Sequence, residues 1–196
     1  SEITMKSNKL INLIFELGQL KRVKHEGWRL VGVEHPESVA EHSLRAAQIG
    51  YLIAKLEGYK NPEEICAMLV FHDMAETRVG DIHKVANRYV KRDEKSAAKA
   101  QTKELGKLGI EIFKLWETSE NIKTVQGIIV KDADLLDMAF MAKEYMEQGH
   151  KYAKDWIHNI EKRLKTKTAK KLLSGLKKTH SNEWWKGLKK IKTNKI

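Results

Sequence analysis

Residues 65–76 read ICAMLVFHDMAE, an apolar run that leads into a histidine, an aspartate and, three residues later, a glutamate. Burying His72, Asp73 and Glu76 next to such a run is costly unless the groups are paired or hold a metal ion. The Asn61-Pro62 pair ahead of the run is typical of a helix start. We therefore expect a helix from this pair to Glu76, with the three polar side chains near one another.

Two other segments carry similar residues inside apolar stretches. Glu41-His42 lies thirty residues before His72 and follows Ser38, which forms a capping-box pattern with Glu41. Asp132 and Asp134 interrupt a later apolar segment. Bundles build metal sites from inward-facing residues on different helices, so these residues are candidates for one shared site.

Each piece alone also has an ordinary structural explanation. A buried histidine is more often a hydrogen-bonded core residue than a ligand, and Asp132 or Asp134 could cap a helix or pair with Lys131. The co-occurrence of these residues in three apolar segments favours a metal centre. A mixed set of imidazole and carboxylate ligands suits Mn, Fe, Co, Ni or Zn better than Ca, and Mg is less favoured.

The remainder of the chain also reads as helix. Of the 196 residues 41% are apolar and only two are proline, and alternating strand patterns are almost absent. Helices are expected over 4–20, 39–57, 62–76, 93–107, 110–117 and 120–148, followed by two or three shorter ones over 152–192. Gly106 and Gly109 are expected to break the helix over 93–107, and Ser119 is expected to cap the long helix over 120–148. This predicts an all-α bundle in one domain, with 1–150 as its core and 151–196 as a basic helical extension packed on the same domain.

The net charge of +11 is concentrated at the end of the chain. Residues 151–196 hold fifteen Lys/Arg and three Asp/Glu, a net of +12, which leaves −1 for the rest. Such a segment could attract nucleic acid, but a solvated lysine-rich face is the favoured interpretation. No apolar run approaches the roughly 20 residues that cross a bilayer, so no membrane partner is expected. The single cysteine, Cys66, and the lack of a secretory pattern favour a cytoplasmic setting.

Taken together, these motifs resemble the HD-domain phosphohydrolases, and more narrowly the branch that includes 5′-deoxynucleotidases. The segments that carry the resemblance lie between about residues 10 and 145, in the order and at the spacing of that family. They are Leu20-Lys21-Arg22-Val23, Gly27-Trp28, residues 36–43 (PESVAEHS), residues 72–76 (HDMAE), residues 79–82 (VGDI) and residues 130–134 (VKDAD).

The resemblance implies an HD-domain helical bundle and a role for each matching residue. The implied metal ligands are His42, His72, Asp73 and Asp134, with Asp134 preferred over Asp132 because of its Lys-x-x spacing. Glu76 and Asp81 match acids at the reaction centre, where Glu76 would orient or deprotonate the attacking water and Asp81 would donate a proton to the leaving group. Substrate contacts are implied for Trp28, His42, Asp73, Asp81, Ile82, His83, Lys84 and Asp134.

The chain departs from the family pattern just before Trp28. The family usually has an arginine there, but Gly27 occupies the position, so His25 or Arg22 is expected to bind phosphate instead. Trp28 itself has an alternative role as an anchor of its loop to the core.

The implied activity is hydrolysis of nucleoside 5′-monophosphates, favouring the deoxy forms, by a homodimer that uses a divalent transition metal. A second possibility within the same chemistry is a phosphodiesterase or a hydrolase of a signalling nucleotide. A third, of a different class, is a non-catalytic module that binds nucleotide or nucleic acid through the basic segment.

Overall fold

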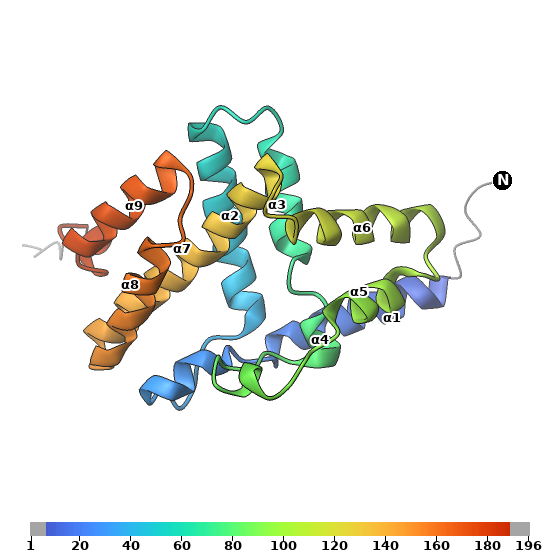
Figure 1. Cartoon of the computed structure of the whole chain (residues 1–196), viewed down its shortest axis with the longest axis horizontal. Helices are drawn as coiled ribbons and strands as arrows, with labels where there is room; N and C mark the ends of the chain where they lie inside the picture. Colours follow the sequence, from blue (N-terminus) through green and yellow to red (C-terminus); the bar gives the residue numbers. More distant parts are fainter. Residues whose placement is uncertain (1–6, 189–196) are drawn as a thin grey trace, which may run out of the picture.

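The computed structural model describes residues 7–188 and is helical through most of this range (Figure 1). The α-helices are α1 (Ser7–Gly18), α2 (Val39–Leu56), α3 (Pro62–Phe71), α4 (Glu76–Val79), α5 (Glu94–Thr102), α6 (Gly106–Ser119), α7 (Val125–Glu147), α8 (Lys154–Glu161) and α9 (Lys167–Lys178). Short 3-10 helices are η1 (Gln19–Lys21), η2 (Glu26–Val31), η3 (Ala86–Arg88), η4 (Lys151–Ala153) and η5 (Glu183–Trp185). Residues 7–188 contain no strand, and the expected all-α class is confirmed.

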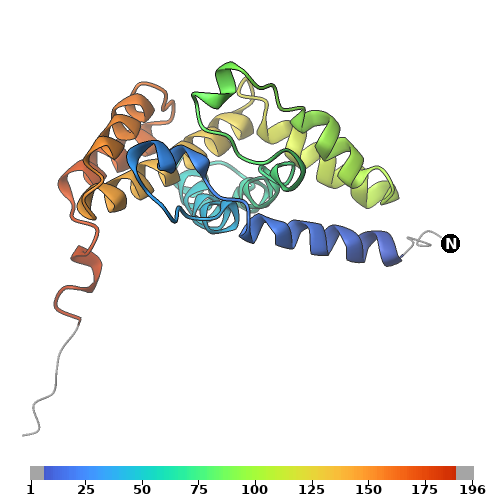
Figure 2. The same ribbon diagram turned by 90° about the horizontal axis from the view of Figure 1, so that it is seen from below.

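Three helices form the centre of the bundle. Helix α2 lies against both α3 and α7 (Figures 1 and 2). Gly50 makes this close approach possible, because a Cβ there would lie 2.1 Å from Leu69 Cδ1 of α3 and 3.5 Å from Ala133 Cβ of α7. The fully buried Ile53 and Ile65 fill the adjoining space. The centre is therefore tight where the three candidate ligand segments meet.

The outer helices cover this centre from two sides. Helices α8 and α9 pack on α7, and their buried side chains belong to the same hydrophobic core as those of α2 and α3. A second, smaller core joins α1, α5 and α6 around Leu13, Met74 and Trp116, on the opposite side in Figure 1. Residues 189–196 of the basic extension and the predicted helix start at residue 4 lie outside the described range. None of the described helices is both long and apolar enough to cross a membrane.

The helix expected to reach Glu76 ends earlier, at Phe71. Backbone hydrogen bonds there span three residues instead of four, from Met74 N to Phe71 O (3.1 Å) and from Glu76 N to Asp73 O (3.0 Å). His72 and Asp73 therefore lie in a tight turn, and Glu76 begins the separate helix α4. The prediction of one continuous helix through these residues is wrong.

Two further helix boundaries differ from the predictions. Gly106 lies at the break between α5 and α6 with a φ of 58°, as predicted, but Gly109 does not break a helix because it lies inside α6. A Cβ at Gly109 would lie 1.9 Å from Thr102 O, so this glycine lets α6 pack closely against the end of α5. Ser119 is the last residue of α6, and the cap of α7 is Thr124, whose hydroxyl accepts from Gly127 N at 3.0 Å.

The predicted capping box at the start of α2 is confirmed. Ser38 Oγ accepts from Glu41 N at 3.2 Å, and Glu41 Oε2 accepts from Ser38 N at 2.6 Å. Both bonds satisfy backbone donors that the first turn leaves free. The box fixes the start of α2 one turn before His42.

Candidate metal centre

The four predicted ligands converge from three elements. His42 projects from the first turns of α2, His72 and Asp73 from the turn after α3, and Asp134 from the middle of α7. His42 Nε2 lies 3.3 Å from Asp134 Oδ1 and 3.7 Å from Asp73 Oδ2, while His72 Nε2 lies 3.1 Å from Asp73 Oδ2. Ligand atoms of His42, His72 and Asp134 lie within 4.8 Å of one another, so a single ion could contact all of them.

Both imidazoles are oriented to offer Nε2 to this space. His72 Nδ1 lies 2.7 Å from Leu69 O, and a carbonyl can only accept, so Nδ1 carries the hydrogen. His42 Nδ1 lies 2.6 Å from Asp137 Oδ2, which fixes the second ring in the same way. His72 Nε2 is buried and lies 3.1 Å from Asp73 Oδ2, but not in hydrogen-bond geometry. Such an orphaned nitrogen is unfavourable in a folded protein, and a cation bound beside Asp73 and Asp134 would satisfy it.

The charges around this space balance one another in the structure. Burial alone would lower the pKa of His42, but Asp134 and Asp137 outweigh it and raise that pKa well above its usual value. His72 behaves alike, since Asp73 overcomes burial and raises its pKa. Burial opposes the charged form of Asp134, yet Lys131 and His42 hold its pKa well below the ordinary value. Three carboxylates thus favour the protonated form of both imidazoles, and a divalent cation could replace these protons.

A second layer of charged residues supports the ligands. Asp137, fully buried on α7, accepts from His42 through one oxygen and from Arg45 Nε through the other. Arg45 also donates through Nη1 to Glu144 Oε1 at 2.8 Å. Lys131 Nζ lies 2.6 Å from Asp134 Oδ2. Outer carboxylates of this kind orient metal-binding histidines and raise their basicity.

The neighbouring Asp132 has a different role. Its carboxylate is buried and accepts from Lys165 N at 3.0 Å, from Thr166 N at 2.7 Å and from Thr166 Oγ1 at 2.8 Å. It therefore anchors the turn between α8 and α9 to α7. Asp134, by contrast, points toward His42.

The two predicted acids lie beside the ligand cluster. Glu76 is buried, and its Oε2 has no hydrogen-bond partner among the described residues, while Oε1 lies 3.2 Å from Arg92 Nη1. Burial, followed by the charges of Asp73 and Asp81, raises the pKa of Glu76 to about 10. Asp81 Oδ2 accepts from Glu26 N at 2.8 Å, which ties it to η2. Glu76 therefore holds a proton unless a cation offsets the negative charge around it.

Trp28 is a core residue. It is 1% exposed, its ring packs against Tyr145 and Trp156 at centroid distances of 5.3 and 5.2 Å, and its Nε1 donates to Glu37 Oε1 at 3.3 Å. This geometry favours the alternative in which Trp28 anchors its loop. The substrate contact expected for Trp28 stays a prediction.

The two candidates for phosphate binding differ in location. His25 is buried, its ring centroid lies 4.4 Å from that of His42, and its Nδ1 lies 3.2 Å from Glu37 Oε1. Arg22 is exposed, and its guanidinium lies 3.4 Å from Gln19 Oε1 at the end of the first helix. The structure thus places His25 next to the cluster and turns Arg22 toward the surface.

The loop residues predicted to contact the nucleotide follow Asp81 directly. Ile82 and His83 are partly buried and Lys84 is exposed. His83 Nδ1 accepts from Ala86 N at 3.1 Å, so its ring stabilises the turn that leads into η3.

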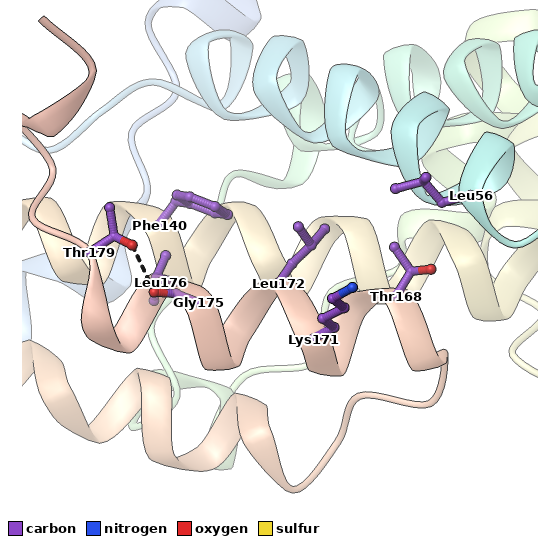
Figure 3. Close-up of a pocket in the computed structure, with 8 residues that line it drawn as sticks. All are labelled: Leu56, Phe140, Thr168, Lys171, Leu172, Gly175, Leu176 and Thr179. Carbon is purple, nitrogen blue, oxygen red and sulfur yellow. Dashed lines mark hydrogen bonds between the residues drawn. The ribbon is translucent and has the colours of Figure 1, made fainter.

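A hollow of about 630 Å³ lies elsewhere, between α2, α7 and α9 (Figure 3). Apolar side chains, among them Leu56, Phe140 and Leu172, make up much of its lining, and Lys171 is its charged residue. It contains no imidazole or carboxylate. It is therefore no alternative to the centre formed by α2, α3 and α7.

Three charged residues around the centre were not predicted as site residues. Asp137 lies three residues after Asp134 and Arg45 three residues after His42, so helical spacing places each on the face of a ligand. Helical spacing from the predicted ligands could therefore have been used to predict Asp137 and Arg45 as site residues. Arg92 lies sixteen residues after Glu76, across a loop, and no periodicity links the two.

Comparison with known proteins agrees with this geometry. Residues 17–176 match the family model described as HD domain. The chain is 38% identical over 143 residues to the 5′-deoxynucleotidase HDDC2 of Dictyostelium discoideum, covering 68% of this chain and 75% of that protein. It is 34% identical over 149 residues to the human protein of that name, covering 74% and 72%.

Solved structures show the same fold. A conserved hypothetical protein from Pyrococcus furiosus superposes with a TM-score of 0.70 at 30% identity, covering 86% of this chain and 99% of that one. A protein from Magnetospirillum magnetotacticum, described as a predicted metal-dependent phosphohydrolase, superposes with a TM-score of 0.63 at 20% identity, covering 87% and 90%.

Proposed function

The chain belongs to the HD-domain family, and from this premise we propose that it is a metal-dependent phosphomonoesterase that hydrolyses nucleoside 5′-monophosphates to nucleoside and phosphate. Relatives named 5′-deoxynucleotidase support a preference for the deoxy forms. The observation that carries the proposal is the convergence of His42, His72 and Asp134 around the orphaned His72 Nε2.

In this proposal the metal is held by His42, His72, Asp73 and Asp134. A divalent ion in such a site polarises a phosphate oxygen and lowers the pKa of a bound water. The donor set favours Mn, Co, Ni, Fe or Zn over Mg.

Glu76 and Asp81 would supply the proton transfers. Their environments differ, as an acid–base pair requires, because Glu76 is buried while Asp81 is partly exposed and held by Glu26 N. Glu76, which is buried beside the ligand cluster, would orient or deprotonate the attacking water, and Asp81 would protonate the leaving sugar oxygen.

Substrate would be bound at the mouth of the centre. His42, Asp73 and Asp134, which lie close together, would contact the substrate, and Asp81, Ile82, His83 and Lys84 would contact it from the adjoining loop. His25 is favoured over Arg22 as the phosphate-binding residue because it is next to His42.

Three further features of the proposal come from the sequence: the oligomeric state, the cellular location and the division of the chain. We propose that the protein is a homodimer and acts in the cytoplasm. We also propose that residues 151–196 form a helical extension that folds together with the core of residues 1–150 as one domain. The shared hydrophobic core of α7, α8 and α9 supports that unit.

The test is phosphate release by chelator-stripped protein from matched ribo- and deoxyribonucleoside monophosphates, with Mn, Co, Mg, Zn or no metal. We expect metal-dependent release from the deoxy forms that is lost in Asp73→Ala. Equal phosphate release from the ribo forms would contradict the sugar preference but support metal-dependent hydrolysis of nucleoside monophosphates. Release from cyclic or signalling nucleotides only would favour the phosphodiesterase alternative. Salt-sensitive nucleic-acid binding with no turnover would favour a binding module.

A further inference from the structure

Arg92 joins the two ends of the loop that carries Asp81. This loop runs from Gly80, after α4, to Arg92, before α5. Arg92 Nη1 donates to Gly80 O at 2.5 Å and lies 3.2 Å from Glu76 Oε1, and Nη2 lies 2.8 Å from Glu94 Oε1. One guanidinium thus bridges the loop start, the buried acid and the first residue of α5.

Little apolar packing holds this loop otherwise. Val85, Tyr89 and Val90 are 52%, 81% and 51% exposed. The side chain of Arg92 is only 15% exposed. A loop with exposed apolar side chains depends on its polar contacts for a defined position, because burial contributes little to its stability.

The same guanidinium lies between the two acids. Arg92 Nη1 is 4.0 Å from Asp81 Oδ1, while Asp81 Oδ2 is held by Glu26 N. Glu76 and Asp81 are both negative or potentially negative, and a nucleotide phosphate adds further negative charge. A cation fixed between them reduces this repulsion and holds both carboxylates at the edge of the metal centre.

From these contacts we propose that Arg92 is a positioning residue for the reaction, which holds Glu76 and the Asp81–Lys84 segment in place through a bridge from Gly80 O to Glu94. This inference rests on the proposed function for its effect on catalysis, while the bridge itself does not. Arginine suits the role because its planar fork serves several acceptors at once, which a lysine ammonium on a flexible stem does less well.

The test compares Arg92→Met, Arg92→Lys and Arg92→Ala with a matched control, Arg78→Met. Arg78 also pairs with a glutamate, Glu16, at 2.6 Å, but on the surface near α1. Arg92→Met should lower kcat by roughly ten- to hundredfold through misplacement of the acids, with a smaller change in KM and unchanged Mn affinity. Arg92→Lys should recover part of kcat, and added guanidinium ion should partly restore Arg92→Ala. Arg78→Met should leave kcat and KM as in the wild type.

Hydrogen exchange separates this inference from the proposed function. Amides of residues 81–91 should exchange faster in Arg92→Met than in wild type or Arg78→Met, whether or not any nucleotide is hydrolysed. Wild-type exchange and wild-type kcat in Arg92→Met would overturn the proposal. Loss of kcat with no guanidinium rescue, no recovery in Arg92→Lys and a lowered melting temperature would also overturn it, because a general loss of stability would then explain the effect.

Discussion

Replacing Asp137 by asparagine should weaken metal binding although Asp137 is not a ligand. The side chain is fully buried, and its two oxygens accept from His42 Nδ1 and Arg45 Nε. An amide of the same shape offers one acceptor and one donor group, so one of these two donors loses its partner. The variant also removes the negative charge that favours the Nδ1–H form of His42, with Nε2 free for a cation.

The magnitude follows from the contact that is lost. A hydrogen bond to a charged group contributes about 1.5–3 kcal/mol, and outer-shell substitutions at metal sites typically cost about 10–100-fold in affinity. We therefore expect Asp137→Asn to bind Mn or Co roughly 10–100-fold more weakly, or about 1.4–2.7 kcal/mol. The assay is calorimetric metal titration of chelator-stripped protein, with metal-free thermal unfolding in parallel.

Glu144→Gln is the matched control. It removes charge from the other partner of Arg45, at 2.8 Å, without touching His42. Its metal affinity should equal that of the wild type. Wild-type metal affinity in Asp137→Asn, or an equal loss of affinity in both variants, would refute the idea that Asp137 strengthens metal binding by orienting His42.

Three further predictions concern the fold around the centre. Asp132→Ala should lower the unfolding free energy by about 3 kcal/mol or less, by leaving buried donors unpaired, yet leave Mn affinity unchanged; chemical denaturation and metal titration together check this. Gly109→Ala should destabilise by about 1–3 kcal/mol despite the better helix propensity of alanine, because its Cβ would meet Thr102 O at 1.9 Å and backbone must shift; urea unfolding measures it. Arg78 lowers the pKa of Glu16 from 4.5, so this pair stabilises the fold above pH 4.5, and its contribution is lost as the pH falls through the lowered pKa. Glu16→Gln should therefore lower the free energy of unfolding in urea at pH 7 and change it less at acid pH.

Most of the fold could be predicted from the spacing of apolar residues. The helical class, the capping box at Ser38 and the central place of the α7 segment follow from local patterns. The end of α3 could not be predicted from a local pattern. After Phe71 the backbone switches to hydrogen bonds that span three residues, and there His72 and Asp73 lie beside His42, which is far away in the sequence. Gly109 was misjudged for a similar reason, since its role is a contact with Thr102 that no local pattern reveals.

The site was predictable to the extent that its residues carry unusual chemistry in apolar surroundings. His42, His72, Asp73 and Asp134 stand out in this way, and the structure brings them together. The role of Trp28 could not be predicted in this way, because a tryptophan in a loop can either anchor the loop to the core or contact a substrate. Arg92 is one of many basic residues in a chain with 37 of them, so only its contacts distinguish it.

The charge balance of the centre explains how a metal could bind without rearranging its surroundings. Nearby carboxylates raise the pKa of His42 and of His72, which favours the protonated form of both imidazoles. Exchanging these two protons for one divalent cation leaves the net charge of the cluster unchanged. The outer pairs of Asp137 with Arg45 and of Asp134 with Lys131 can then persist.

The number of protons that metal binding releases near neutral pH should therefore be above zero, and binding should tighten as the pH rises, since deprotonation precedes coordination. Calorimetry in buffers of different ionisation enthalpy measures this number directly. In His72→Gln the release should fall, because one of the two imidazoles that can give up a proton is gone. Binding that is independent of buffer and pH would mean that the imidazoles are already neutral, and that the carboxylates alone prepare the centre for its ion.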